Sequence, residues 1–335
     1  MSKKDLLKSV LNKEKTHRTP VGFWHHFLAD EHHSDALENK NYKIENLKGH
    51  EQFIKEVQPD YIKIMTDGYF LYPNEDLRTA ESLADVPSIQ SLGKDHPWIR
   101  EQVQFAKEVE DLHHDELYSF YNIFGPLTTW KFLYDERDER LGRFFQENPE
   151  YFAEILRVIA EDIRSVIEGV LSETTVDGIY YSTQDLQTDV FTDQDFKNLV
   201  KPLDISLLET AEQIKDHHIL HICGFSGAHN QLEKFLDYPA TAVNWATQSE
   251  HLPISEGKKL FKDRVIVGGF PNTANDLIYQ GSEQEIKDYT KELIKEAADL
   301  SYILGADCTI PKDTPTEHLE WVRQASREVG VDNEE

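Results

Sequence analysis

The chain has 335 residues, of which 39% are hydrophobic and 29% are charged, and its formal net charge is -27. A chain of this length suits one large α/β barrel or two average domains, and it can bury a core that needs no disulfide or metal staple. Because so acidic a surface repels phosphate backbones and anionic lipids, we expect no nucleic-acid partner and no membrane partner.

The apolar residues and the cysteines favour a cytoplasmic protein. No apolar run approaches the ~20 residues of a membrane span, and residues 1–20 lack the apolar centre of a signal peptide. The chain contains two cysteines. In a reducing cytoplasm, metal binding or catalysis is a better expectation for them than a disulfide.

Short apolar runs alternate with amphipathic segments along the chain. Runs rich in Val, Ile, Tyr and Phe predict strands at residues 21–24, 61–65, 117–125, 178–183, 218–223, 242–245, 265–270 and 302–308. Amphipathic periodicity predicts helices at 148–171, 282–300 and 314–330. Eight strands alternating with helices favour an α/β fold, a single (β/α)8 TIM barrel over residues 1–335 with an acidic tail at 331–335. A doubly wound open sheet is the alternative, but no G-x-G-x-x-G motif follows the first strand.

His221, Cys223 and Cys308 form a possible metal-binding set. His221 and Cys223 lie two positions apart on the fifth predicted strand, so their side chains leave the same face. Cys308 ends the eighth predicted strand, and in a barrel both strand ends open onto the same mouth. Two thiols and one imidazole are typical zinc ligands, with a fourth position left for water or substrate. The alternative, which spacing alone does not exclude, is a pair of buried structural cysteines beside a hydrogen-bonded histidine.

Other polar and aromatic residues follow the predicted strands. Asp67 and Asp185 come after the second and fourth strands; each is a candidate catalytic carboxylate and a candidate partner for the free ring nitrogen of His221. The sequence does not choose between them. The remaining candidates could line a substrate or corrinoid pocket: His25, His26, Tyr181, Asn244 and Trp245. The alternatives are that they lie in a solvated loop or pack in the core.

Five segments carry motifs of a known family. They are "LLKSVLNKEKTHRTPVGFW" (6–24), "FGPLTTW" (124–130), "YSTQD" (181–185), "VIVGGFPNTANDLIYQGSEQEI" (265–286) and "GADCTIPKDTPTEHLEWV" (305–322). These segments resemble the uroporphyrinogen decarboxylase superfamily, from its opening helix and first strand to its closing segment. The resemblance spans nearly the whole chain and implies a TIM barrel of the uroporphyrinogen decarboxylase and methionine synthase type.

The resemblance points to one of the family's two branches. In that branch, H-x-C followed by a distant C holds the zinc of methyltransferases that move a methyl group from a corrinoid to a thiol. His221, Cys223 and Cys308 match this pattern residue by residue. Decarboxylases of the other branch use no metal and bind the carboxylates of their substrate with arginines after the first strand. No arginine lies between Arg18 and Arg78 in this chain.

We therefore predict a zinc-dependent methyltransferase that moves a methyl group from a corrinoid, either methylcobalamin or a corrinoid protein, to a small thiol. We expect the corrinoid on a partner protein, because no D-x-H-x-x-G corrinoid-binding motif occurs in the chain. One alternative is a uroporphyrinogen decarboxylase of porphyrin synthesis, since Asp67 falls where that branch has its aspartate. A second is a non-catalytic barrel that binds zinc or a corrinoid partner. The sequence leaves monomer and homodimer equally open.

Overall fold

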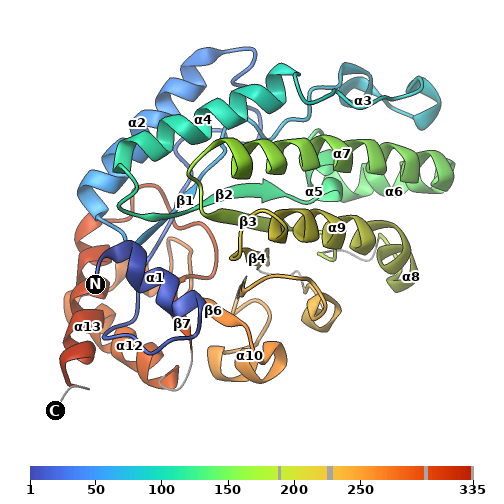
Figure 1. Ribbon diagram of the computed structural model, residues 1–335. Coiled ribbons are helices and arrows are strands. Elements are labelled where there is room, and N and C mark those ends of the chain that lie inside the picture. Colours follow the sequence, from blue (N-terminus) through green and yellow to red (C-terminus); the bar gives the residue numbers. More distant parts are fainter. Residues whose placement is uncertain (188–189, 225–228, 298–300, 333–335) are drawn as a thin grey trace.

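The computed structural model describes residues 1–187, 190–224, 229–297 and 301–332. Its centre is a curled parallel sheet of seven strands, in which each strand pairs with the next one along the chain (Figure 1). The strands are β1 (Tyr61–Ile64), β2 (Tyr118–Phe124), β3 (Gly178–Thr183), β4 (Ile219–Ile222), β5 (Ala242–Trp245), β6 (Val265–Phe270) and β7 (Tyr302–Ala306). Parallel strands that pair in chain order bring all their carboxyl ends to one edge of the sheet.

Helices connect the strands and form an outer layer. The longer ones are α1 (Lys3–Leu11), α2 (Lys40–Val57), α4 (Pro97–His113), α6 (Arg137–Glu147), α7 (Pro149–Glu173), α9 (Lys201–Glu212), α10 (Ile254–Phe261), α12 (Glu283–Glu296) and α13 (Thr316–Asp332). Shorter turns of helix are α3 (Glu75–Thr79), η1 (Leu83–Asp85), α5 (Pro126–Lys131), α8 (Asp193–Asp195), η2 (Phe196–Val200), η3 (Leu232–Phe235) and α11 (Leu277–Gln280). Around the sheet, α10, α12, α13, α2, α4, α7 and α9 contact one another in that order. The sheet is therefore covered on its outer face.

The predicted helix at 148–171 is confirmed as α7. Asn148 caps its first turn by accepting a hydrogen bond from the backbone N–H of Tyr151 (3.1 Å), and Pro149 occupies the first helical position. The apolar stripe faces the sheet and is buried along its whole length. Its members, Phe152, Ile155, Leu156, Ile159, Ile163, Val166, Ile167 and Val170, are at most 2% exposed.

The first predicted strand, 21–24, is wrong as a strand, and the sheet accordingly has seven strands and stays open. Val21 forms one isolated parallel bridge with Leu304 of β7. Its backbone oxygen accepts from the N–H of Asp60 (3.0 Å), just before β1. Its N–H, however, donates to the side chain of Asp60 (2.8 Å), which also forms two hydrogen bonds with Arg18. The Val21 N–H that a strand pairing with β1 would need is bonded to the Asp60 carboxylate instead. The segment therefore lies between β7 and β1 without becoming a strand of the sheet.

The other seven predicted strands are confirmed with small shifts at their ends. The run expected at 302–308 ends at Ala306, so that Cys308 lies in the loop beyond β7. Of the expected tail at 331–335, the first two residues end helix α13, and residues 333–335 lie outside the described part. Among the described residues, no helix is both long and apolar enough to span a bilayer.

Candidate metal centre

His221, Cys223 and Cys308 meet at the carboxyl edge of the sheet. His221 lies on β4, Cys223 follows β4, and Cys308 follows β7. One ligand atom from each lies within 4.8 Å of the other two, and no other group of three His, Cys, Asp or Glu does so in the described part of the chain. Both cysteines are free and half-buried, whereas His221 is 2% exposed. The strand order therefore brings together residues 87 positions apart in the sequence.

The distances between these atoms match a tetrahedral zinc site. The Sγ atoms of Cys223 and Cys308 are 3.9 Å apart, and Cys308 Sγ is 3.5 Å from His221 Nε2. With Zn–S bonds of about 2.3 Å and Zn–N bonds of about 2.05 Å, tetrahedral angles put two sulfurs about 3.8 Å apart and a sulfur and a nitrogen about 3.6 Å apart. The donor set and its spacing thus fit zinc with little rearrangement, with one coordination position left over.

Asn244 on β5 orients the imidazole of His221. The Nδ1 of His221 is hydrogen-bonded to the side-chain oxygen of Asn244. That oxygen also accepts from the hydroxyl of Tyr180 (3.0 Å). The amide nitrogen of Asn244 donates to the backbone oxygens of Val267 (2.9 Å) and Ala306 (3.2 Å), so the oxygen must face the imidazole. Since an amide oxygen only accepts, Nδ1 carries the proton and Nε2 presents its lone pair to the cysteines.

The expectation that Asp67 or Asp185 orients His221 is therefore wrong. The sequence places several polar groups at strand ends, but only the register between β4 and β5 sets His221 beside Asn244. Asn244 was expected only as a pocket residue. The sequence signal for it is an amide within a buried apolar strand: Asn244 lies two residues after Ala242, so both side chains face the same side of β5, the strand next to that of His221.

The hydrogen bond between the two cysteines shifts their pKa values in opposite directions. It lowers the pKa of Cys308 well below its ordinary value, and His221 acts in the same direction. The same bond raises the pKa of Cys223. The side-chain nitrogen of Gln184 lies 3.7 Å from Cys223 Sγ, and that of Gln187 donates to the Cys223 backbone oxygen (2.7 Å). The loop after β3 thus holds the loop after β4 and fixes the position of Cys223.

Asp67 belongs to a second buried group beside the centre. It is fully buried, and its carboxylate accepts from His26 Nδ1 (2.8 Å) and from the backbone N–H groups of Phe27 (2.6 Å) and Leu28 (3.3 Å). Burial opposes ionisation, but these hydrogen bonds outweigh it and lower the pKa of Asp67. Burial likewise opposes charge on His26, and the bond to Asp67 raises the pKa of His26 above its ordinary value. His25 instead bonds the His26 backbone oxygen (2.9 Å) and packs against Phe27.

Asp185 lies in a separate network behind β3. It accepts from the hydroxyls of Thr128 (3.0 Å) and Thr183 (2.5 Å), and burial raises its pKa. Tyr181 is part of the same buried region and donates to Asp204 (2.6 Å). Tyr181 thus faces outward from the sheet toward α9, while Tyr180 faces inward toward Asn244. Its role is core packing, the alternative that the sequence left open.

Trp245 also lies in the packed layer outside the sheet. Its indole N–H donates to the backbone oxygen of Leu252 (2.8 Å), and its ring packs on Phe261. A Cβ atom at Gly257 would lie 2.1 Å from the Trp245 ring, so helix α10 approaches it as closely as a glycine allows. The expectation that Trp245 lines the pocket is therefore wrong. Trp245 directly follows Asn244, whose side chain faces inward, and consecutive side chains of a strand point to opposite faces of the sheet.

Lys63 on β1 was not predicted to belong to the site. Its side chain is 6% exposed, and its Nζ lies 4.1 Å from the centre of the Tyr180 ring and 5.1 Å from that of Trp24. Burial lowers the pKa of Lys63 to about 8, although the charges of Cys308, Cys223 and Asp67 oppose that shift. A lone lysine within the apolar run "YIKIM" is the sequence signal that could have drawn attention to it.

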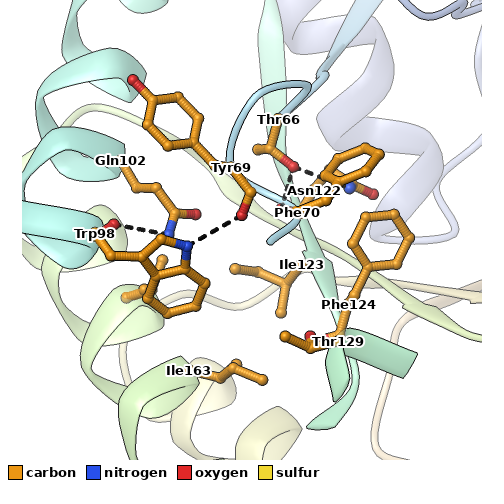
Figure 2. A pocket seen from close by; sticks show the side chains of 11 residues that line it. Thr66, Tyr69, Phe70, Trp98, Gln102, Asn122, Ile123, Phe124, Thr129 and Ile163 are labelled. Atoms are coloured by element: carbon orange, nitrogen blue, oxygen red, sulfur yellow. Dashed lines mark hydrogen bonds between the residues drawn. The ribbon is translucent and has the colours of Figure 1, made fainter. Parts of the chain in front are cut away.

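A small cavity lies elsewhere in the fold, between β2 and helices α4 and α7 (Figure 2). Trp98 Nε1 donates to the backbone oxygen of Tyr69 (3.2 Å), and Gln102 donates to that of Trp98 (2.9 Å). Its volume of about 20 Å³ suits a single water molecule. None of the three ligand residues lines it, so it is separate from the metal centre.

The fold and the site together define a class of protein. The protein has an α/β fold with a parallel sheet, and its Cys–Cys–His cluster lies at the carboxyl edge of that sheet. Active sites of such folds are usually at this edge, so the cluster is a candidate metal centre. The model of the uroporphyrinogen decarboxylase (URO-D) family matches residues 72–329. The chain therefore belongs to the uroporphyrinogen decarboxylase family.

Solved structures give the same fold. A methyltransferase from Methanosarcina mazei superposes with a TM-score of 0.73 at 14% identity, covering 98% of this chain and 99% of that one. A B12-independent methionine synthase from Shewanella sp. W3-18-1, in complex with selenomethionine, superposes with a TM-score of 0.58 at 13% identity, covering 94% and 97%. No curated protein sequence matches this chain. At these identities the likeness establishes the fold.

Proposed function

We propose that this protein is a zinc-dependent methyltransferase that moves a methyl group from a corrinoid to a small thiol. The observation that carries the proposal is the spacing of Cys223, Cys308 and His221, whose ligand atoms already lie at the separations of a tetrahedral zinc site. Three protein ligands with an open fourth position are the arrangement of catalytic zinc rather than structural zinc.

The chain's own residues would prepare this site for a thiol. His221, Cys223 and Cys308 would hold the zinc, and Asn244 keeps the Nε2 lone pair of His221 directed at it. Bound zinc would deprotonate the substrate thiol, whose ordinary pKa is about 8.5, and position its sulfur to take the methyl group from the donor. The corrinoid would arrive on a separate protein.

The structural neighbours support this choice over the alternatives. One is a methyltransferase, and the other is a methionine synthase that is independent of B12, so the first supports methyl transfer and neither supports decarboxylation. The decarboxylase alternative depended on Asp67. That carboxylate is fully buried, and its oxygens are taken by His26 and two backbone N–H groups. Burial and these three hydrogen bonds make it less available to a tetrapyrrole than an exposed carboxylate would be. The alternative of a non-catalytic zinc protein calls for a fourth protein ligand, and the cluster has three members among the described residues.

Metal analysis is the first test. Protein purified without a metal-affinity column should contain about one zinc per chain, as expected for a single three-ligand site. The variants His221→Gln and Cys308→Ala should lose the zinc and, with it, methyl transfer from methylcobalamin to thiols, while their circular dichroism stays that of the folded protein.

A matched control is His217→Gln. His217 lies just before β4, at the end of the strand away from the candidate metal centre, and its Nε2 is hydrogen-bonded to the side chain of Asn12 (2.9 Å). This variant should retain zinc and activity. Wild-type protein that contains no zinc and takes none up would overturn the proposal, and decarboxylation of a porphyrinogen should then be assayed. Zinc that stays bound in Cys308→Ala would show that the three-ligand site is wrong.

A further inference from the structure

Lys63 is a buried cation in the interior of the curled sheet. Its side chain lies across the faces of two aromatic rings, those of Tyr180 and Trp24, with Nζ 4.1 Å and 5.1 Å from their centres. Aromatic faces attract a cation, but they offer it no hydrogen-bond acceptor. A lysine that is 6% exposed normally has an anionic or carbonyl partner as well.

Within the described residues, the Lys63 ammonium forms no hydrogen bond and has no carboxylate within 4.0 Å. The contrast is Lys131, the other deeply buried lysine. Lys131 Nζ donates to the backbone oxygen of Gln184 (2.8 Å) and pairs with Asp138 (3.2 Å). The Lys63 ammonium thus has three donors and, in the part of the chain that is described, two ring faces but no hydrogen-bond acceptor beside it.

A second donor beside Lys63 is also unused. The indole Nε1 of Trp24 is buried, and no acceptor lies within hydrogen-bond distance of it among the described residues. Trp24 lies 5.2 Å from Tyr180, ring centre to ring centre, and shares the Lys63 cation with it. A buried ammonium favours an anionic acceptor, and a buried indole N–H on the same group of rings can donate to an oxygen of that anion.

This donor group adjoins the metal centre. The Tyr180 ring, on which Lys63 rests, is 5.6 Å from the imidazole of His221, and its hydroxyl shares the Asn244 oxygen with that imidazole. The ring of Tyr180 thus contacts both the Lys63 ammonium and the imidazole of the candidate metal centre, so the two lie on the same inward face of the sheet.

We propose that Lys63 binds an anionic group of the substrate, so that the acceptor is a small thiol carrying a carboxylate or another oxyanion. This inference rests on the proposed function, because it takes the thiol to be held at the metal centre. Lys63 then selects among thiols: the anion gains a charge-assisted hydrogen bond in a site shielded from water, which an uncharged thiol lacks.

Lys63 has one competing role, as a counter-charge that stabilises the two cysteines as thiolates. The two roles differ in what the loss of the charge would change. A counter-charge for the cysteines would affect zinc retention and would act equally on every thiol. A substrate-binding ammonium would leave zinc in place and act on anionic thiols alone.

The experiment compares 3-mercaptopropionate with 3-mercapto-1-propanol, which have the same carbon chain and differ in charge. Binding of each to the zinc-loaded protein is measured by titration calorimetry, and kcat/KM with methylcobalamin is measured in parallel. The proteins are the wild type, Lys63→Met, Lys63→Arg and a control, Lys43→Met, which carries the same substitution on the outer helix α2. Zinc content is determined for each.

We expect the wild type to prefer the anionic thiol by about 10- to 100-fold, the usual effect of one charge-assisted hydrogen bond in a shielded site. Lys63→Met should lose this preference and keep its zinc, Lys63→Arg should keep part of the preference, and Lys43→Met should match the wild type. A wild type without the preference overturns the inference even if Lys63→Met fails to fold. So does a Lys63→Met variant that keeps the preference or that loses its zinc. If neither thiol binds the zinc-loaded wild type, the proposed function itself fails, and this result is distinct from the other two.

Discussion

At the scale of single residues, the amide of Asn244 determines which ring nitrogen of His221 is available to a metal at the candidate centre. Both amide hydrogens are bound to backbone oxygens, so the side chain cannot rotate to present its nitrogen to His221. The tautomer of His221 follows from this, and with it the lone pair on Nε2. Lys63 and Trp24 illustrate the opposite situation, in which a buried donor has no hydrogen-bond acceptor among the described residues.

The pair formed by Asp67 and His26 predicts a stability that depends on pH. The folded-state pKa of Asp67 is lowered, so its contribution is present above its unfolded value of about 3.9 and is lost as the pH falls through the folded value. The folded-state pKa of His26 is raised, so its contribution is present below about 6.5 and is lost as the pH rises through the folded value. The pair therefore stabilises the protein most between these limits.

The variant Asp67→Asn tests this. Its free energy of unfolding should be lower than that of the wild type by about 1–3 kcal/mol near pH 5.5, the cost of weakening a buried charge-assisted hydrogen bond. The difference should shrink toward pH 3.5 and toward pH 8. Urea unfolding at the three pH values measures it. A difference that is constant with pH would mean that the effect comes from packing rather than from the ion pair.

At the scale of elements, the segment at residues 18–22 connects the two edges of the sheet. Gly22 N–H donates to Leu304 of β7 (3.0 Å), while Val21 bonds the backbone and the carboxylate of Asp60 beside β1. The close approach requires glycine, because a Cβ atom at position 22 would lie 2.2 Å from the ring of Tyr61. A few hydrogen bonds and one carboxylate thus replace a full strand.

Gly22→Ala should destabilise the fold through this contact. We expect the free energy of unfolding to fall by about 1–3 kcal/mol, the usual effect of overpacking in a core. Urea denaturation measures the change, with the exposed substitution Gln52→Ala on α2 as the control. An unchanged midpoint in Gly22→Ala would mean that Tyr61 moves aside freely and that the segment does not hold the edges together.

At the scale of the whole molecule, the net charge of -27 sets the long-range electrostatics. The like charges repel one another in the compact state and less so in the expanded chain. Exposed ion pairs such as Lys259 with Glu256 offset little of this repulsion.

The thermal midpoint should therefore rise with salt. Between about 10 mM and 150 mM NaCl the Debye length shortens from about 30 Å to about 8 Å, which screens the repulsion across the surface. We expect an increase of a few degrees in Tm, measured by calorimetry at pH 7.5. A Tm that falls with salt would mean that attractive ion pairs outweigh the net repulsion. The same change in choline chloride concentration, in place of NaCl, controls for sodium binding.

The sequence by itself determined the order of the elements and the three residues that form the candidate metal centre. Periodicity is local, so seven strands and the buried stripe of α7 could be predicted within a few residues. The two-residue spacing of His221 and Cys223 places them on one face wherever the strand lies. The carboxyl ends of parallel strands then bring Cys308 to them, whatever the detailed register.

Only the tertiary structure decided the partners of these residues. Asn244 rather than Asp67 or Asp185 orients His221, because register and side-chain rotation are set by contacts between strands that are distant in the sequence. For the same reason the sequence could not show that Tyr181 faces outward or that the segment at 21–24 forms one bridge. The inward direction of Lys63, for which the described part of the chain offers no hydrogen-bond acceptor, likewise depends on which rings the curled sheet places around it.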